Sequence, residues 1–167
     1  MEKLIELFDS HLEVFRKFID RLIVVLFTIQ ILVVFSQVVS RYVFNSSLTW
    51  AEEMARYLQV WVVLLAAAAA VRSGSHISVD YATYNLPMKY KRLLQIIIMF
   101  LTTFFLYFVT TYGFKLFLYI HNSRQLSPAM QIPMSIAYSA IPLGALFMLI
   151  ESTILFLKLI MNKQAEK

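Results

Sequence analysis

The chain has 167 residues but contains no cysteine, and it has only three histidines and three glycines. The absence of cysteine excludes disulfide bonds, thiol redox chemistry and cysteine-ligated metal sites. The histidines fall in the N-terminal segment and in two predicted loops, so they cannot jointly bind a metal or supply two axial ligands to a haem. The sequence shows no glycine-rich phosphate-binding loop and no catalytic grouping of side chains. We therefore expect a protein that is not an enzyme and has no cofactor of its own.

Charged residues are also scarce, at 15%, whereas 60% of the residues are hydrophobic and the mean hydropathy is +0.70. We predict an all-α integral membrane protein that forms a single membrane domain over residues 1–167. Its four transmembrane helices are expected at about 20–43, 50–72, 90–120 and 134–160, since roughly 20 apolar residues cross a bilayer. A soluble all-helical core is the weaker alternative. The net charge of +5 is attributed to asymmetric loops and not to nucleic-acid binding.

Residues 2–19 have the pattern of a strongly amphipathic helix that precedes the first span. Apolar side chains on one side oppose charged side chains on the other: Leu4, Ile5, Phe8, Leu12, Phe15, Phe18 and Ile19 against Glu2, Glu6, Asp9, Glu13, Arg16, Lys17 and Asp20. Such a helix is expected to lie in the membrane interface, and docking on a partner is the alternative. The first residues are acidic and basic, so no cleavable leader is expected.

The second span is predicted to begin with a capping box, because Glu52 follows Thr49 by three residues. One face is polar or small and the other large and apolar: Glu52, Arg56, Gln59, Val63, Ala66 and Ala70 against Trp50, Tyr57, Trp61, Leu64 and Leu65. Glu52 and Arg56 are spaced for an ion pair on the same face. A small face in a membrane is expected to pack on protein. Trp50, Trp61 and Lys115 are the predicted membrane-interface anchors.

The first span carries a polar stripe of Gln30, Gln37 and Arg41, which should face protein because polar groups in hydrocarbon need partners. We expect Arg41 to pair with Glu52 or Glu53. The 90–120 helix is longer than the bilayer requires and should tilt or project.

Glu151 is the one carboxylate well inside a span. A structural ion pair is favoured over a proton relay, because Arg21 and Arg72 are expected at matching depth. For His76 and Asp80, contacts at a helix end are favoured over a binding site. Pro142, close to Gly144, predicts a kink in the fourth span.

Lysine and arginine are concentrated in the N-terminal segment, in the middle loop and in the tail. The positive-inside rule then places both termini in the cytoplasm. No internal repeat is evident, so an autonomous inverted-repeat transporter is not supported.

Three stretches carry a family resemblance. Residues 41–45 (RYVFN), 48–57 (LTWAEEMARY) and 72–80 (RSGSHISVD) resemble the DctQ-like small membrane subunits of TRAP (tripartite ATP-independent periplasmic) transporters, and residues 127–133 and 138–144 are similar to the start of the same family's fourth helix. The run Ala66–Ala70 departs from the family, whose members often have a glycine there.

The resemblance implies a bacterial inner-membrane protein that forms a heterodimer with a large membrane subunit and is surrounded by lipid. The large subunit would carry the sodium sites and move as an elevator, while a periplasmic binding protein delivers an organic acid such as a C4-dicarboxylate or sialic acid. This chain would act as a scaffold. Two alternatives remain open from the residues: a self-contained proton-coupled transporter that works as a homodimer through Glu151 and, more distantly, an enzyme.

Overall fold

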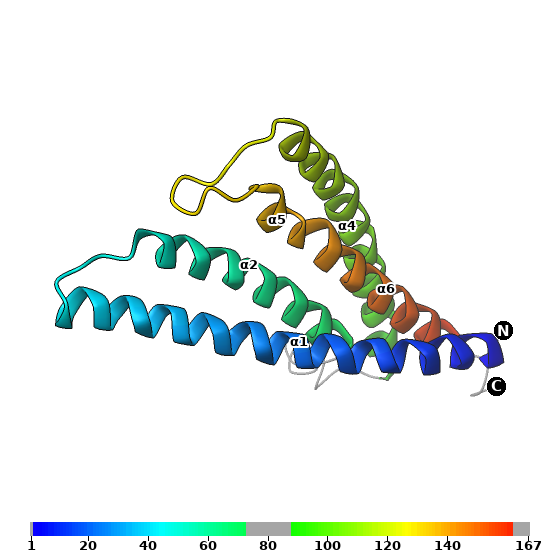
Figure 1. The fold of residues 1–167 in the computed structure, drawn as a ribbon. Helices are drawn as coiled ribbons and strands as arrows, with labels where there is room; N and C mark the ends of the chain where they lie inside the picture. The colour runs from blue at the N-terminus through cyan, green and yellow to red at the C-terminus, as the bar shows by residue number, and fades with distance from the viewer. Residues whose placement is uncertain (1, 73–87, 162–167) are drawn as a thin grey trace.

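The computed structural model describes residues 2–72 and 88–161, which form helices and connecting turns without a strand. The helices are α1 (Glu2–Val43), α2 (Thr49–Arg72), α4 (Met88–Asn122), α5 (Ser135–Tyr138) and α6 (Ala140–Met161) (Figure 1). Four stretches in this part of the chain are long and apolar enough to cross a membrane: Leu12–Val43, Thr49–Arg72, Arg92–Asn122 and Ser135–Ile160. The predicted all-α class with four spans is confirmed.

The helices pack in a row and do not surround a common centre. The principal contacts join α1 to α2, α2 to α6, and α6 to α4, so α1 and α4 lie at the two edges. Figure 1 shows the α1–α2 hairpin and the α4–α6 hairpin close together where α1 begins and α6 ends, and farther apart at the opposite end. This arrangement leaves apolar surface exposed on both edge helices.

Residues 2–19 do not form a separate helix, because α1 runs without interruption from Glu2 to Val43. Neither glycine nor proline occurs between these two residues, so nothing in the local sequence ends the helix. The amphipathic segment is therefore the first part of one continuous helix that includes the first span.

The described core is thin and built largely of alanine. Six of its ten buried apolar residues are alanines, namely Ala51, Ala55, Ala68, Ala137, Ala140 and Ala145. Gly144 brings α6 against α2 so closely that an added Cβ would lie 2.6 Å from the Cβ of Leu64. Gly113 of α4 makes a similar but looser approach to Ile141, at 3.0 Å. Small residues thus provide the close backbone contact that stabilises helices where apolar burial alone gives no driving force.

The fourth span is interrupted, and the break between α5 and α6 falls at Ser139. Pro142 follows three residues later and has no N–H to donate to the carbonyl four residues before it, so one hydrogen bond of a continuous helix is missing. Near Pro142, where a kink was expected, the structure has the short helix α5 followed by the long helix α6. The 35-residue α4 is about 52 Å long at 1.5 Å per residue, so it is longer than a bilayer core of about 30 Å.

Candidate functional site

The inner polar cluster, at the end where α1 begins and α6 ends, is centred on Glu151 of α6. Both carboxylate oxygens of Glu151 accept hydrogen bonds from the Arg16 guanidinium of α1, from Nε to Oε1 and from Nη2 to Oε2, each at 2.7 Å. Both side chains are mostly buried, with 16% of Arg16 and 11% of Glu151 exposed. This two-pronged geometry is the strong form of an arginine–carboxylate pair.

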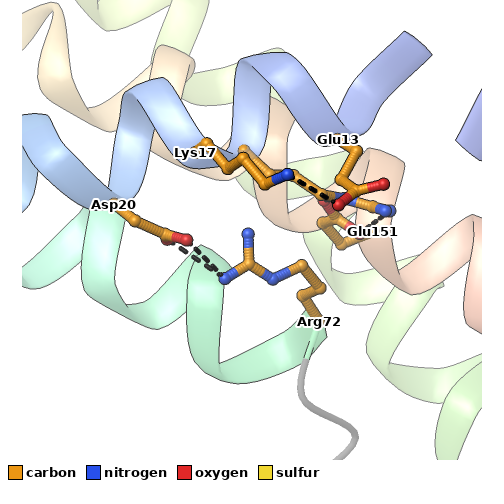
Figure 2. Close-up of polar contacts among 6 residues, drawn as sticks. Glu13, Lys17, Asp20, Arg72 and Glu151 are labelled. Atoms are coloured by element: carbon orange, nitrogen blue, oxygen red, sulfur yellow. Dashed lines mark hydrogen bonds and ion pairs between the residues drawn. The ribbon is translucent and has the colours of Figure 1, made fainter. Parts of the chain in front are cut away.

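A second ion pair lies one turn further along α1. Nη2 of Arg72, at the end of α2, donates to both carboxylate oxygens of Asp20 at 2.9 and 3.0 Å (Figure 2). Glu13 and Lys17 form a third pair at 2.9 Å on the exposed side of α1. An apolar groove between α1, α2 and α6 adjoins the two inner pairs and is lined by Leu12, Phe15, Ile19, Ala68, Phe147 and Ile150, among others. The two cross-helix pairs tie the start of α1 to α6 and to α2.

The outer polar cluster, at the opposite end, is centred on Glu53 of α2, which is 7% exposed. Its Oε1 accepts a hydrogen bond of 2.6 Å from the Tyr57 hydroxyl. Its Oε2 accepts backbone N–H bonds from Ala129 at 2.9 Å and from Met130 at 3.0 Å. Non-helical backbone near a membrane needs partners for its polar groups, and Glu53 supplies them for the loop between α4 and α5.

The same loop is also held from within by Ser127, which is fully buried. The backbone N–H of Ser127 donates to the carbonyl of Ile132 at 2.8 Å, and its own carbonyl accepts from the N–H of Gln131 at 3.1 Å. Gln131 adopts a left-handed backbone with φ of 56°, which closes the turn. The loop is therefore a defined structure fixed to α2.

Arg41 does not take the partner that the sequence suggested. Glu53 is fully engaged by Tyr57 and the loop, and Glu52 pairs with Arg56 at 3.2 Å on the exposed face of α2. Arg41 is exposed at the end of α1 and forms no ion pair with any side chain that the structure describes, namely those of residues 12–72, 90 and 92–160. The predicted pairing of Arg41 with Glu52 or Glu53 is therefore not formed, whereas the predicted spacing of Glu52 and Arg56 does produce contact.

The partners of Glu151 and Arg72 also differ from those expected. Arg21 is exposed, and Arg72 pairs with Asp20. Glu151 pairs with Arg16 instead of with either of these two arginines.

The predicted membrane anchors have different surroundings. The Trp61 indole donates a 3.1 Å hydrogen bond to the carbonyl of Ile136 in α5. Trp50 is 43% exposed at the start of α2. The Lys115 ammonium lies 5.1 Å from the centre of the Tyr112 ring. His76 and Asp80 lie outside the described residues.

The arrangement positions helices and offers little for chemistry. Among the described side chains of residues 12–72, 90 and 92–160, no three histidine or carboxylate groups converge as metal ligands. The inner carboxylates of Glu151 and Asp20 and the outer carboxylate of Glu53 are all engaged in hydrogen bonds within the chain.

The sequence pattern places Arg16 and Asp20 on the polar side of an amphipathic helix and Tyr57 on the apolar face of α2, and it does not indicate the partners of these side chains. The spacing of four between Glu53 and Tyr57, the same as between Glu52 and Arg56, was the available signal for that contact. The backbone groups of Ala129 and Met130 gave no signal, because they are distant in sequence from Glu53.

Comparison with known proteins points to a single family of membrane transporters. Residues 30–161 match the family described as "Tripartite ATP-independent periplasmic transporters, DctQ component". The chain is 29% identical over 102 residues to the C4-dicarboxylate TRAP transporter small permease protein DctQ of Rhodobacter capsulatus, covering 61% of this chain and 45% of that protein. It is 28% identical over 111 residues to the ectoine TRAP transporter small permease protein TeaB of Halomonas elongata, covering 66% and 58%.

A third relative is much longer. The sialic acid TRAP transporter permease protein SiaT of Haemophilus influenzae is 31% identical over 85 residues, which are 51% of this chain but only 14% of that protein. The match thus spans less than two thirds of each of these three relatives. The family match, however, covers most of this chain and includes all four spans in whole or in part. The chain belongs to the DctQ components of the tripartite ATP-independent periplasmic transporters.

Proposed function

We propose that this chain is the fixed, small membrane subunit of a sodium-coupled transporter for organic acids, and that it supports a large membrane subunit which carries the ion and substrate sites. The observation that carries the proposal is the state of Glu151. Both of its oxygens are held by Arg16 in a mostly buried pair, so the best-placed carboxylate for ion coupling is engaged in joining α1 to α6. A relay group needs to exchange its proton or ion during the cycle, which this pairing opposes.

The row of helices supports the same role. A self-contained transporter needs a polar site enclosed near the middle of the membrane. Among the described residues, the cross-helix ion pairs lie toward one end of the helices and the Glu52–Arg56 pair toward the other, and the edge helices expose long apolar faces. A separate partner that carries the site accounts for both features. The relative in which the matched region is 14% of a longer permease chain supports a partner that is another membrane protein.

The cargo is proposed only as a class. The relatives are named for C4-dicarboxylate, ectoine and sialic acid, and these names do not agree on one cargo. A periplasmic binding protein would deliver the cargo, and the single membrane domain would lie in the bacterial inner membrane with both termini in the cytoplasm. Cysteines placed at Ser46 and Ser123 should then react with an impermeant thiol reagent from the periplasm, whereas one at Lys163 should not. Labelling at Lys163 from outside would contradict this orientation.

Co-expression with the neighbouring membrane and periplasmic proteins tests the function. Uptake of a panel of organic acids should require this chain, because the large subunit is destabilised without it. In the purified complex, Glu151→Gln should weaken assembly but leave sodium dependence and substrate affinity nearly unchanged. An assembled Glu151→Gln complex that has lost sodium coupling would contradict the scaffold role, and proton-coupled transport by this chain alone would favour the homodimer.

A further inference from the structure

One face of α2 is exposed along the length of the helix and forms what we call the α2 crest. It consists of Glu52, Arg56, Gln59, Val60, Val63 and Ala70, with Ala66 half-buried at its edge. The opposite face, which includes Tyr57, Trp61 and Leu65, packs against the rest of the chain. The face that turns outward therefore carries the polar side chains together with two valines and small alanines, and the bulkiest apolar side chains turn inward. Lipid contact alone would favour the reverse orientation.

Gln59 lies near the middle of this face. It is the eleventh residue of a 24-residue helix, so it is about 15 Å along the helix from its first residue at 1.5 Å per residue. Its side chain is exposed and makes no hydrogen bond to residues 12–72, 90 or 92–160, whose side chains the structure describes. A glutamine side chain is too short to bring its amide to the membrane surface from this depth. Acyl chains cannot donate or accept hydrogen bonds, so lipid leaves this amide unsatisfied.

The residues beside Gln59 permit the close approach of another backbone. Val63 is followed on the same side by Ala66 and Ala70, which are four residues apart. Small residues at this spacing let two transmembrane helices come close enough to pack and to exchange hydrogen bonds between side chains. Toward the helix start, the exposed Glu52–Arg56 pair adds charge of both signs at the edge of the membrane.

We propose that the α2 crest is the docking face for a transmembrane helix of the large membrane subunit, and that the Gln59 amide hydrogen-bonds to a polar group of that helix. The inference rests on the proposed function and identifies the surface through which it is carried out. A membrane protein of different sequence is the chosen occupant, because in the longer relative the matched region is a minor part of one permease chain. A second copy of this chain and lipid are the other occupants, and the experiment below separates them.

The exposed face of α4 provides the contrast. It carries an aromatic series with Phe104 packed edge-to-face on Phe108, and Phe105 is 65% exposed beside them. The three phenylalanine side chains have no polar atom that hydrocarbon would leave unsatisfied, so lipid is a sufficient neighbour for them.

Site-specific photo-crosslinking in the co-expressed complex tests the assignment. A photoreactive phenylalanine analogue at Val63 should give an adduct with the large subunit, whereas the same analogue at Phe105 should give none. Gln59→Leu should weaken association of the purified subunits about 3-fold to 20-fold, the range for the loss of one hydrogen bond between membrane helices. Gln59→Asn, which keeps the amide, should lose less, and the unfolding midpoint of the isolated chain should not fall in either variant.

Each other outcome overturns the inference. An adduct at Val63 with a second copy of this chain would replace the large subunit by a homodimer at the crest. Absence of a protein adduct at Val63, in a complex that is intact by co-purification, would assign the crest to lipid and leave the proposed function standing. Native-like association of Gln59→Leu would remove the role of the amide. If the complex does not form at all, the proposed function and this inference fail together.

Discussion

Removing the charge of Glu151 should destabilise this chain far more than removing the charge of Glu13. Glu151 accepts two 2.7 Å hydrogen bonds from Arg16, and only 11% of its side chain is exposed. Glu151→Gln would leave the arginine buried beside a neutral group, and breaking one partner of a buried pair costs about 3 kcal/mol. The Glu13–Lys17 pair has 61% and 66% of its side chains exposed, and an exposed pair at this helical spacing contributes about 0.3–0.5 kcal/mol.

The difference can be measured by unfolding the purified chain in mixed micelles of increasing SDS content, followed through the fluorescence of Trp50 and Trp61. A double-mutant cycle that combines Glu151→Gln with Arg16→Met should give a coupling energy of at least about 2 kcal/mol. Replacing both Arg16 and Glu151 by methionine should recover most of the loss in stability. If Glu151→Gln costs less than about 1 kcal/mol, or costs the same after Arg16 has been replaced, the pair does not join α1 to α6 in the way that its geometry indicates.

Three further changes test the packing and the loop. Gly144→Ala should cost about 1–3 kcal/mol in the same unfolding assay, because the added Cβ would press on the Cβ of Leu64. Gly113→Ala should cost less, since only a methyl group of the Ile141 side chain must move. Equal costs would argue against the close α2–α6 approach. Glu53→Gln should speed amide exchange in the loop between α4 and α5, because it replaces a charged acceptor of two backbone N–H groups, whereas Glu52→Gln should not; unchanged exchange would show that the loop is held by other contacts. Thr103→Val removes the 2.7 Å partner of a fully buried serine hydroxyl in α6 and should lower stability by about 1 kcal/mol, and a neutral result would contradict that contact.

The presence of four spans and the polar face of α2 could be predicted from the sequence, because each depends on local composition and helical spacing. Contacts between neighbouring residues on one helix could also be predicted, as Glu52 and Arg56 show. The unbroken α1 was predictable in principle from the lack of glycine and proline, but the amphipathic pattern of residues 2–19 suggested a separate helix. A change in polarity along a helix does not end it.

The family resemblance was likewise carried by local motifs, and the family match now bears it out. Partners across helices could not be predicted, because they depend on how far each helix is shifted and rotated relative to its neighbours. Glu151 pairs with Arg16 and not with Arg21, which lies five residues further along the same helix. Composition alone does not distinguish these two arginines.

The sequence by itself determined an all-helical membrane chain with four spans and a polar stripe on its second span. Only the tertiary structure decided that the helices form a row, that the Glu53 carboxylate holds a distant loop, and that the polar stripe of α2 faces outward. The physical reason is the distance along the chain over which each effect acts. Hydropathy and helical periodicity act over one or two turns, whereas the order of helices and the pairing of their charges depend on close backbone approach at positions such as Gly144, which the packing of the whole chain selects.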